Sequence, residues 1–199
     1  MDVKSRKAEQ SAATRDSLVA VARELFAERG YGDVPTEEIV RRAGVTRGAL
    51  YHHFRDKRDL FHAVVEQVEI ELTQRIATES LAGKDPVEAL QIGAQAFLDA
   101  CREPAIQQIL LADAPSVLGW SAWRELGSRY GLGVIEAALG AAMDAGLIAR
   151  QPIKPLSHLL LGGLDEAAMY VATADDAASA RAEMGAILDR YLRALAAEV

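Results

Sequence analysis

Apolar side chains recur every three or four positions along most of the chain, which is the period of an α-helix with one buried face. Residues 14–30 form the first such stretch and end at Gly30, a residue that can stop a helix. A longer stretch begins after Asp56, which can cap a helix with Asp59 three residues on. Its apolar positions are Phe61, Val65, Val68, Leu72 and Ile76. No segment shows convincing β alternation or an internal repeat, so the sequence predicts an all-α protein.

Between these stretches, residues 36–44 predict a short helix that ends in a turn. Thr36 is a good N-cap, and the charges of Glu37 and Glu38 suit the positive end of a helix dipole. Ile39, Val40 and Ala43 supply the buried side of this helix. Gly44 stands where the chain must reverse, because glycine adopts the left-handed conformation of a helix C-terminus without a steric cost.

A second short helix follows the glycine. Thr46 can cap it, and Leu50 and Phe54 are four residues apart on one face. The rest of its surface is polar or aromatic and consists of Arg47, Gly48, Tyr51, His52 and Arg55. Two helices joined by a glycine turn are typical of a helix-turn-helix, whose second helix enters the major groove of DNA.

Arg47 is the best candidate for reading bases, because arginine can form two hydrogen bonds with one guanine. Gly48 and Ala49 carry almost no side chain and would let the helix lie close to DNA. Phosphate oxygens can be contacted by three further side chains, which would fix register without reading sequence. These are Tyr51, His52 and Lys57.

Other interpretations of this segment are possible. A glycine-joined helix pair by itself occurs in many helical proteins. His52 and His53 could be a solvated pair at a helix end. They are poor metal ligands, because adjacent helical residues point about 100° apart and metal pairs on helices use i, i+3 or i, i+4 spacing. We therefore expect no metal site and no cofactor.

The segment 14–62 resembles the TetR family of bacterial transcriptional regulators. The motif runs are AxELFAERGY at the end of the first helix, T-x-x-I-x-x-x-A-G-V over 36–45 and G-A-L-Y-x-H-F-x-x-K over 48–57. The resemblance implies that Leu50 and Phe54 hold the second motif helix on a small core. It also implies a DNA surface made by the residues that match Thr36, Arg47, Gly48, Tyr51, His52 and Lys57. Some relatives have a basic or small residue where this chain has Glu37 and Glu38, so we exclude both from the expected contacts.

Charge divides the chain in a way that agrees with DNA binding at one end. Residues 1–60 carry 12 basic and 10 acidic side chains, a net charge of +2, whereas the whole chain carries −7 and the remainder therefore −9. Residues 1–13 contain Lys4, Arg6 and Lys7 and predict a disordered basic arm, either solvated or following a groove. The expected domains are a helix-turn-helix domain over 14–60 and a larger helical ligand-binding and dimerisation domain over 61–199.

Several classes of protein are not expected. No window approaches the roughly 18 uninterrupted apolar residues of a membrane span, and no signal peptide precedes the first helix, so we expect a cytoplasmic protein. The single cysteine, Cys101, excludes an intrachain disulfide and is expected to be a small packing residue. No nucleophile motif, paired carboxylates at catalytic spacing or phosphate-binding glycine loop is present, so no enzymatic activity is expected.

The last two predicted helices suggest a dimer interface. Pro155 can occupy the first turn of a helix with an apolar stripe and a surface of small residues, including Gly162 and Gly163. The final helix has its own stripe, formed by Met184, Ile187, Leu188, Tyr191 and Leu195. Both stripes could instead complete a monomeric core. The resemblance favours pairing of the two helices across a two-fold axis, which would let two recognition helices read a palindrome.

A sensor pocket is expected in the larger domain. Its candidate residues combine apolar and aromatic surface with a few polar handles, although each of them alone is more often a core residue. They are Phe97, Cys101, Leu110, Trp120, Trp123, Tyr130, His158 and Met169. Trp120 and Trp123 follow an expected break at 113–116, where helices can part and a pocket can open. The set favours a small apolar or aromatic effector.

The sequence thus predicts a homodimeric repressor that leaves a palindromic operator when a small effector binds. A ligand-dependent activator is one alternative. A protein that coats double-stranded DNA without sequence preference is another, and the acidic remainder of the chain argues against it.

Overall fold

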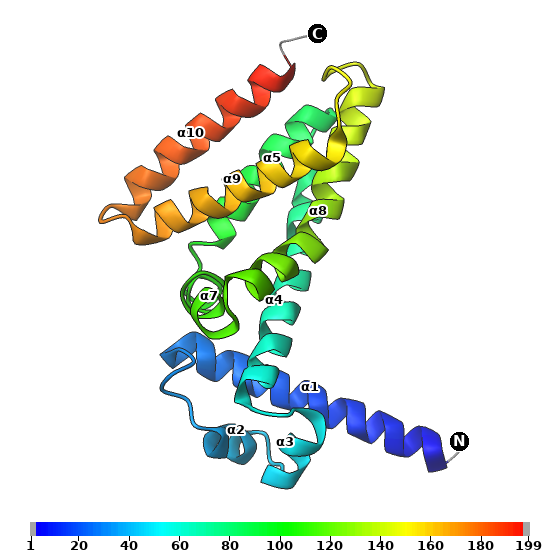
Figure 1. Cartoon of the computed structure of the whole chain (residues 1–199), viewed down its shortest axis with the longest axis vertical. Coiled ribbons are helices and arrows are strands. Elements are labelled where there is room, and N and C mark those ends of the chain that lie inside the picture. The colour runs from blue at the N-terminus through cyan, green and yellow to red at the C-terminus, as the bar shows by residue number, and fades with distance from the viewer. Residues whose placement is uncertain (1–2, 197–199) are drawn as a thin grey trace. The chain divides into compact units, whose positions relative to one another are not determined.

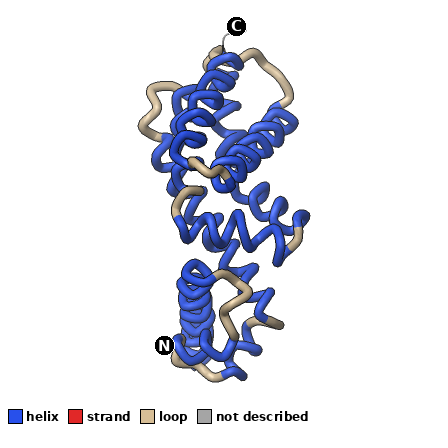
Figure 2. The backbone as a smooth tube through the Cα atoms, turned by 90° about the vertical axis from the view of Figure 1, so that its left-hand side faces the viewer, coloured by secondary structure: helices blue, strands red, loops and turns tan. Residues whose placement is uncertain are grey.

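A computed structural model describes residues 3–196, which are helical apart from turns and short loops (Figure 1; Figure 2). No strand occurs in this range, so the predicted all-α fold is confirmed. The elements are α1 (Val3–Arg29), α2 (Thr36–Arg42), α3 (Arg47–His53), α4 (Lys57–Ser80), α5 (Pro86–Ala100), α6 (Pro104–Ile106), the π-helix η1 (Gln107–Asp113), α7 (Ala114–Leu118), α8 (Trp120–Asp144), α9 (Ile153–Thr173) and α10 (Ala177–Ala196).

The chain forms two compact units whose boundaries differ from the predicted ones. The first unit combines residues 1–68 with residues 104–120, and the second combines residues 69–103 with residues 121–199. The division falls inside α4 and not at residue 60. Because residues 104–120 pack on α1, a segment that the sequence assigned to the larger domain belongs to the first unit.

Helix α1 corrects the prediction of a disordered arm. It begins at Val3, so residues 3–13 continue the first helix instead of preceding it. This run contains neither glycine nor proline and is rich in residues that favour helices, and Ser5 Oγ donates to Glu9 Oε1 at 2.9 Å within it. Residues 1–2 and the side chains of Lys4 and Lys7 lie outside the described range.

Two local expectations are also corrected. Thr36 is the first residue of α2 and not its N-cap, a position held by Pro35 in extended conformation. The break expected at 113–116 lies at Gly119, whose φ of +84° favours glycine. Pro115 instead lies in the first turn of α7, which continues directly from η1.

The first unit is built on a small aromatic core. Phe26 and Phe61 are fully buried and meet edge to face with ring centroids 5.3 Å apart. Tyr31 packs against both rings. Such aromatic contacts add to the apolar burial that joins α1 to the start of α4.

In the second unit, α5, α9 and α10 lie alongside one another, and the end of α8 joins their core (Figure 1). Leu139, Leu156, Leu160 and Leu192 are among the residues buried together there. At a close approach of α5 and α10, Gln95 Nε2 donates to the carbonyl of Gly185 at 2.9 Å. The stripe predicted on the penultimate helix therefore serves, in part, the core of its own unit.

Candidate nucleic-acid interface

The turn between α2 and α3 is closed as the sequence predicts. Gly44 has a φ of +67°, and the Val45 N–H donates to the Val40 carbonyl at 3.0 Å. This left-handed residue satisfies carbonyls at the end of α2 and redirects the chain. Thr46 then adopts an extended conformation, and its Oγ1 accepts a hydrogen bond from the Ala49 N–H at 3.1 Å. The predicted cap of the second motif helix is confirmed.

Helix α3 is held on the first unit by two side chains. Leu50 is fully buried and Phe54 is almost so, and they supply the apolar face four residues apart. The guanidinium of Arg15 from α1 lies 5.4 Å from the centroid of the Phe54 ring, within cation–π range. The core roles expected for Leu50 and Phe54 agree with this packing.

The opposite face of α3 is open. Thr46, Arg47, Gly48, Tyr51 and His52 are exposed. A methyl group placed on Gly48 would meet only Thr46 Oγ1, at 3.8 Å, outside its own helix backbone. The predicted contact residues on α3 therefore form one uncovered surface, together with the half-buried Ala49.

Arg47 has partners within this surface. Its Nη1 lies 3.1 Å from Glu37 Oε1, and its guanidinium carbon lies 5.5 Å from the centroid of the Tyr51 ring. The pKa of Glu37 is lowered by a backbone hydrogen bond of the residue itself, by the Thr36 hydroxyl and by Arg47. Because both ends of this ion pair are exposed, solvent screens the attraction and the pair contributes little to stability. Glu37 is excluded from the predicted DNA contacts because phosphates would repel it. The sequence does not predict its contact with Arg47 on the other helix.

Two other predicted contact residues are less exposed. Thr36 is half-buried at the start of α2, where its Oγ1 donates to Glu37 Oε2 at 3.2 Å. Lys57 is also half-buried. Its ammonium donates to the Tyr31 carbonyl and lies 4.1 Å from the centroid of the Tyr31 ring. Burial lowers the pKa of Lys57, and the charges of Asp113 and Asp33 oppose that shift. An ammonium has three donors, so the phosphate contact of Lys57 stays a prediction.

Residues 104–120 are tied to the first unit by polar contacts. The Asp113 carboxylate accepts the Tyr31 N–H at 2.7 Å. The Arg58 guanidinium donates to the carbonyls of Val117 at 2.9 Å and Leu118 at 2.7 Å. These contacts join positions that are 59 to 82 residues apart in the chain, so no local sequence pattern could reveal them.

The structure divides the predicted sensor residues between the two units. Leu110 and Trp120 belong to the first unit, whereas Phe97, Cys101, Trp123, Tyr130, His158 and Met169 belong to the second. Within the second unit, Cys101 and Trp123 are buried and His158 is exposed. Burial raises the pKa of the Cys101 thiol, which keeps the thiol protonated and suits a packing residue.

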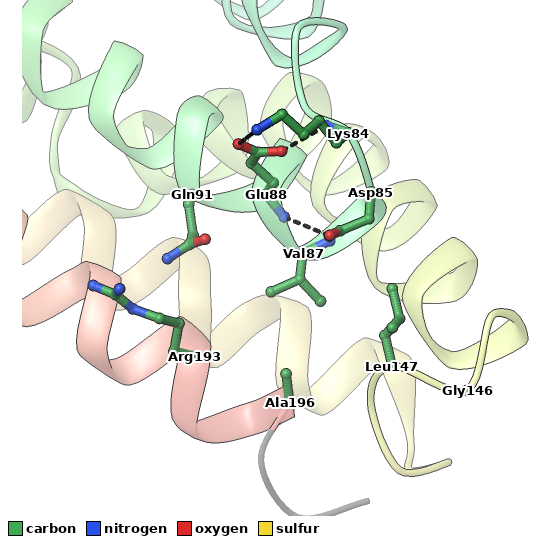
Figure 3. A pocket seen from close by; sticks show the side chains of 9 residues that line it. All are labelled: Lys84, Asp85, Val87, Glu88, Gln91, Gly146, Leu147, Arg193 and Ala196. Atoms are coloured by element: carbon green, nitrogen blue, oxygen red, sulfur yellow. Dashed lines mark hydrogen bonds and ion pairs between the residues drawn. The ribbon is translucent and has the colours of Figure 1, made fainter.

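A hollow of about 550 Å³ opens on the second unit (Figure 3). Its lining consists of Lys84, Asp85, Val87, Glu88, Gln91, Gly146, Leu147, Arg193 and Ala196, and none of the predicted sensor residues is among them. Asp85 Oδ1 is engaged by the N–H groups of Val87 and Glu88 at the start of α5. Lys84 Nζ lies 3.8 Å from Glu88 Oε1. Its acidic side chains therefore cap a helix or pair with a lysine, and they leave no free carboxylate for a ligand.

Part of the surface of α9 and α10 is apolar. Leu159 and Tyr170 on α9, and Ile187 and Tyr191 on α10, are large exposed side chains. Between the first two lies the exposed Gly163, and a methyl group added there would meet no atom within 4 Å. A partner helix could therefore approach α9 closely.

Residues 3–196 contain neither a metal-binding cluster nor a helix suited to span a membrane. No group of three or more His, Cys, Asp and Glu side chains in this range could hold a metal ion. In the same range, no helix combines the length and the apolar content needed to cross a membrane.

The cap, the glycine turn and the open face of α3 define a DNA-binding helix-turn-helix protein. A model of the tetR family of bacterial regulatory proteins matches residues 18–64, and one of the tetracyclin repressor-like C-terminal domain matches residues 87–195. The chain therefore belongs to the TetR family of bacterial transcriptional regulators.

Individual relatives agree with this assignment. The chain is 27% identical over 195 residues to the transposon Tn10 TetC protein of Escherichia coli, with 98% of each chain covered. Over 56 residues, 28% of this chain and 27% of the other, it is 43% identical to the transcriptional repressor BepR of Brucella suis. A crystal structure of a TetR-family regulator from Pectobacterium atrosepticum superposes with a TM-score of 0.84 at 34% identity, covering 94% of this chain and 96% of that one.

Proposed function

We propose that the protein is a homodimeric repressor that binds a palindromic operator and is released from it by a small effector. The exposed face of α3 carries this proposal. The helix is capped and seven residues long, and its residues Arg47, Gly48 and Tyr51 are exposed to solvent. Arg47 reads a base edge, and the neighbouring exposed side chains contact phosphates. Lys57 joins these contacts through donors that Tyr31 leaves available.

Dimerisation is supported by the apolar side chains of α9 and α10. Four large residues, Leu159, Tyr170, Ile187 and Tyr191, are exposed on these two helices. A second copy would remove their apolar surface from water, and the bare backbone at Gly163 would let the helices pack closely. Two-fold symmetry then presents two α3 helices to two half-sites of a palindrome.

Effector binding belongs to the second unit in this proposal. An effector there would favour one arrangement of the helices, and α4 would carry the change because it contributes residues to both units. A coupling free energy of roughly 1–3 kcal/mol would lower the affinity for DNA about 5- to 150-fold. Repression is favoured over activation because BepR, whose matched segment is the DNA-binding part, is named a repressor.

The test is selection of binding sites from randomised duplex DNA by the purified full chain, read by sequencing at near-physiological salt. Enrichment of a palindrome is the expected result, with two proteins bound per site. Enrichment of a single half-site would contradict the dimer. No enrichment at any salt concentration, together with uniform affinity and a steep salt dependence, would identify a protein that coats DNA.

A further inference from the structure

Three charged side chains from three helices of the second unit lie near one another in its interior. Glu69 comes from α4, Arg124 from α8 and Asp165 from α9. Arg124 Nη1 and Asp165 Oδ2 form an ion pair that is largely shielded from solvent. The group contains two carboxylates and one guanidinium, so one carboxylate is left over.

Glu69 is the unpaired member. Among the residues that the structure describes, none donates a hydrogen bond to its carboxylate or forms an ion pair with it. Burial raises the pKa of Glu69 to about 7, and the charge of Asp165 acts in the same direction. Burial also raises the pKa of Asp165 to about 6, although Arg124 opposes that shift.

Glu69 is partly accessible, and a glycine faces its carboxylate. Protein encloses most of the side chain, which raises its pKa, while the residue as a whole retains some accessible surface. A methyl group placed on Gly127 of α8 would lie 3.9 Å from Glu69 Oε1. The glycine thus removes the side chain that would otherwise cover this oxygen.

An aromatic side chain stands on the same face of α8. Trp123 precedes Gly127 by four residues, the spacing at which helical side chains are neighbours, and it is buried. Tryptophan is the aromatic side chain best suited to hold a cation over its ring face. A carboxylate without a protein partner, and an indole one helical turn from the glycine that faces it, together suit an organic cation with an apolar body.

We propose that Glu69 binds the protonated amine of a small apolar or aromatic effector, whose ring or chain lies along the face of α8 that carries Trp123 and Gly127. The ammonium supplies both the positive charge that balances the third charge of the group and the hydrogen-bond donors that Glu69 lacks. This inference rests on the proposed function in that it assigns the chemical class of the effector.

Binding of a cation has a measurable consequence for the proton on Glu69. Near pH 7 this carboxyl is partly protonated, and an ammonium favours the ionised form. The charged and titratable groups around it are Asp165, Arg124 and Cys101, and of these Asp165 is ionised above about pH 6 and the Cys101 thiol stays neutral. A bound amine therefore expels a fraction of a proton from the site at pH 7.

The test uses three probes that share one ring system: naphthylmethylamine, naphthylmethanol and naphthoic acid. Their affinities for the full-length protein are measured by isothermal titration calorimetry at pH 7 in two buffers of different ionisation enthalpy, without DNA. The amine is expected to bind at least about tenfold more tightly than the alcohol, with proton release, and the acid more weakly than both.

Two variants and one control define the role of Glu69. Glu69→Gln keeps the shape of the side chain and is expected to abolish both the preference for the amine and the proton release. Gly127→Leu keeps the carboxylate, fills the space beside it and improves helix propensity, so it should weaken all three probes at least about tenfold in a folded protein. Glu125→Gln removes an exposed carboxylate from the same helix and should behave as the wild type.

Three results would overturn the inference: an amine that binds no better than the alcohol, a preference that survives in Glu69→Gln, or no binding of any probe to the wild type. Because these measurements contain no DNA, their failure is separate from failure of the regulator proposal. Operator selection without a preference for the amine would reject the effector class alone. A Glu69-dependent preference without operator selection would reject the regulator alone.

Discussion

The two units place the residues of interest in opposite environments. In the first unit, Arg47, Tyr51 and His52 are exposed on a seven-residue helix, and buried Leu50 holds that helix in place. In the second unit, Glu69, Arg124 and Asp165 lie between long helices. A surface that binds double-stranded DNA, which is large and regular, can be built from one short segment of the chain. An internal site for a small molecule needs side chains from several segments.

The largest effect on stability is expected at Leu50, which supports the exposed face of α3. Leu50→Ala removes a fully buried side chain below the reading face, and we expect the free energy of unfolding of the first unit to fall by about 2–5 kcal/mol. Chemical denaturation followed by circular dichroism measures this loss. Leu81→Ala is the control, since Leu81 is 83% exposed and its truncation should change stability by less than about 0.5 kcal/mol. Equal effects of the two substitutions would show that Leu50 does not support α3.

Arg47 tests whether the exposed face reads sequence. Arg47→Ala is expected to reduce the preference for the selected operator over random DNA by about 1–3 kcal/mol, because a guanine loses its bidentate partner. Fluorescence anisotropy with both duplexes measures it. Arg55→Ala removes an exposed arginine that pairs with Asp59 and should affect both duplexes alike. If Arg47→Ala also weakens both equally, Arg47 contacts phosphate and does not read bases.

Glu69 gives the second unit a pH dependence that comes from a carboxyl whose pKa is raised, whereas the pKa of Glu37 in the first unit is lowered. Its pKa is about 7 in the folded chain and 4.5 ordinarily, so between these values the folded state binds more protons than the unfolded state. Stability therefore falls as pH rises through this window, by up to about 1.4 kcal/mol per pH unit. Asp165 acts in the same direction at lower pH, up to about 6.

Glu69→Gln should remove the fall in the free energy of unfolding between about pH 6 and 7. The fall at lower pH that is due to Asp165 should remain. Urea denaturation at half-unit pH intervals measures it. Glu125→Gln should retain the wild-type slope, because Glu125 is exposed. A wild-type slope in Glu69→Gln would mean that another group titrates in this window.

The smallest effect is expected at Glu37. Glu37→Gln breaks an exposed ion pair with Arg47, so operator affinity should change by less than about fivefold. Anisotropy titrations at two salt concentrations measure it. Lower salt should enlarge the effect, since the carboxylate also repels phosphates. A loss of more than tenfold on the operator alone would instead assign Glu37 a base contact, such as acceptance from a cytosine amine.

The difference between the units also explains what the sequence could predict. The cap of Thr46, the turn at Gly44 and the buried pair Leu50 and Phe54 are local features, and each follows from residues within four positions. The all-α fold and the family follow from the same kind of pattern. The side-chain contact between Arg47 and Glu37 joins two helices across the turn, and no local pattern predicts it.

The rest depends on contacts that no periodicity encodes. In the sequence, Glu69 looks like any other polar residue of a long helix. Its enclosed environment arises only because α8 and α9 approach it. The predicted sensor residues share apolar or aromatic surface with a few polar groups. They divide between the two units because the chain leaves the second unit at residue 104 and returns at 121. Residues 3–13 are helical because they continue α1, and no apolar face within the run itself predicts this order.

The return of residues 104–120 to the first unit affects the order in which this unit forms during translation. Residues 104–120 complete the first unit through Asp113 and Arg58, so the part that binds DNA is finished only after the chain has been made well past residue 68. Closing contacts across more than 50 residues is slow compared with forming a helix turn. During translation, the α2–α3 pair would therefore emerge early on an incomplete support, and competence to bind an operator would appear late.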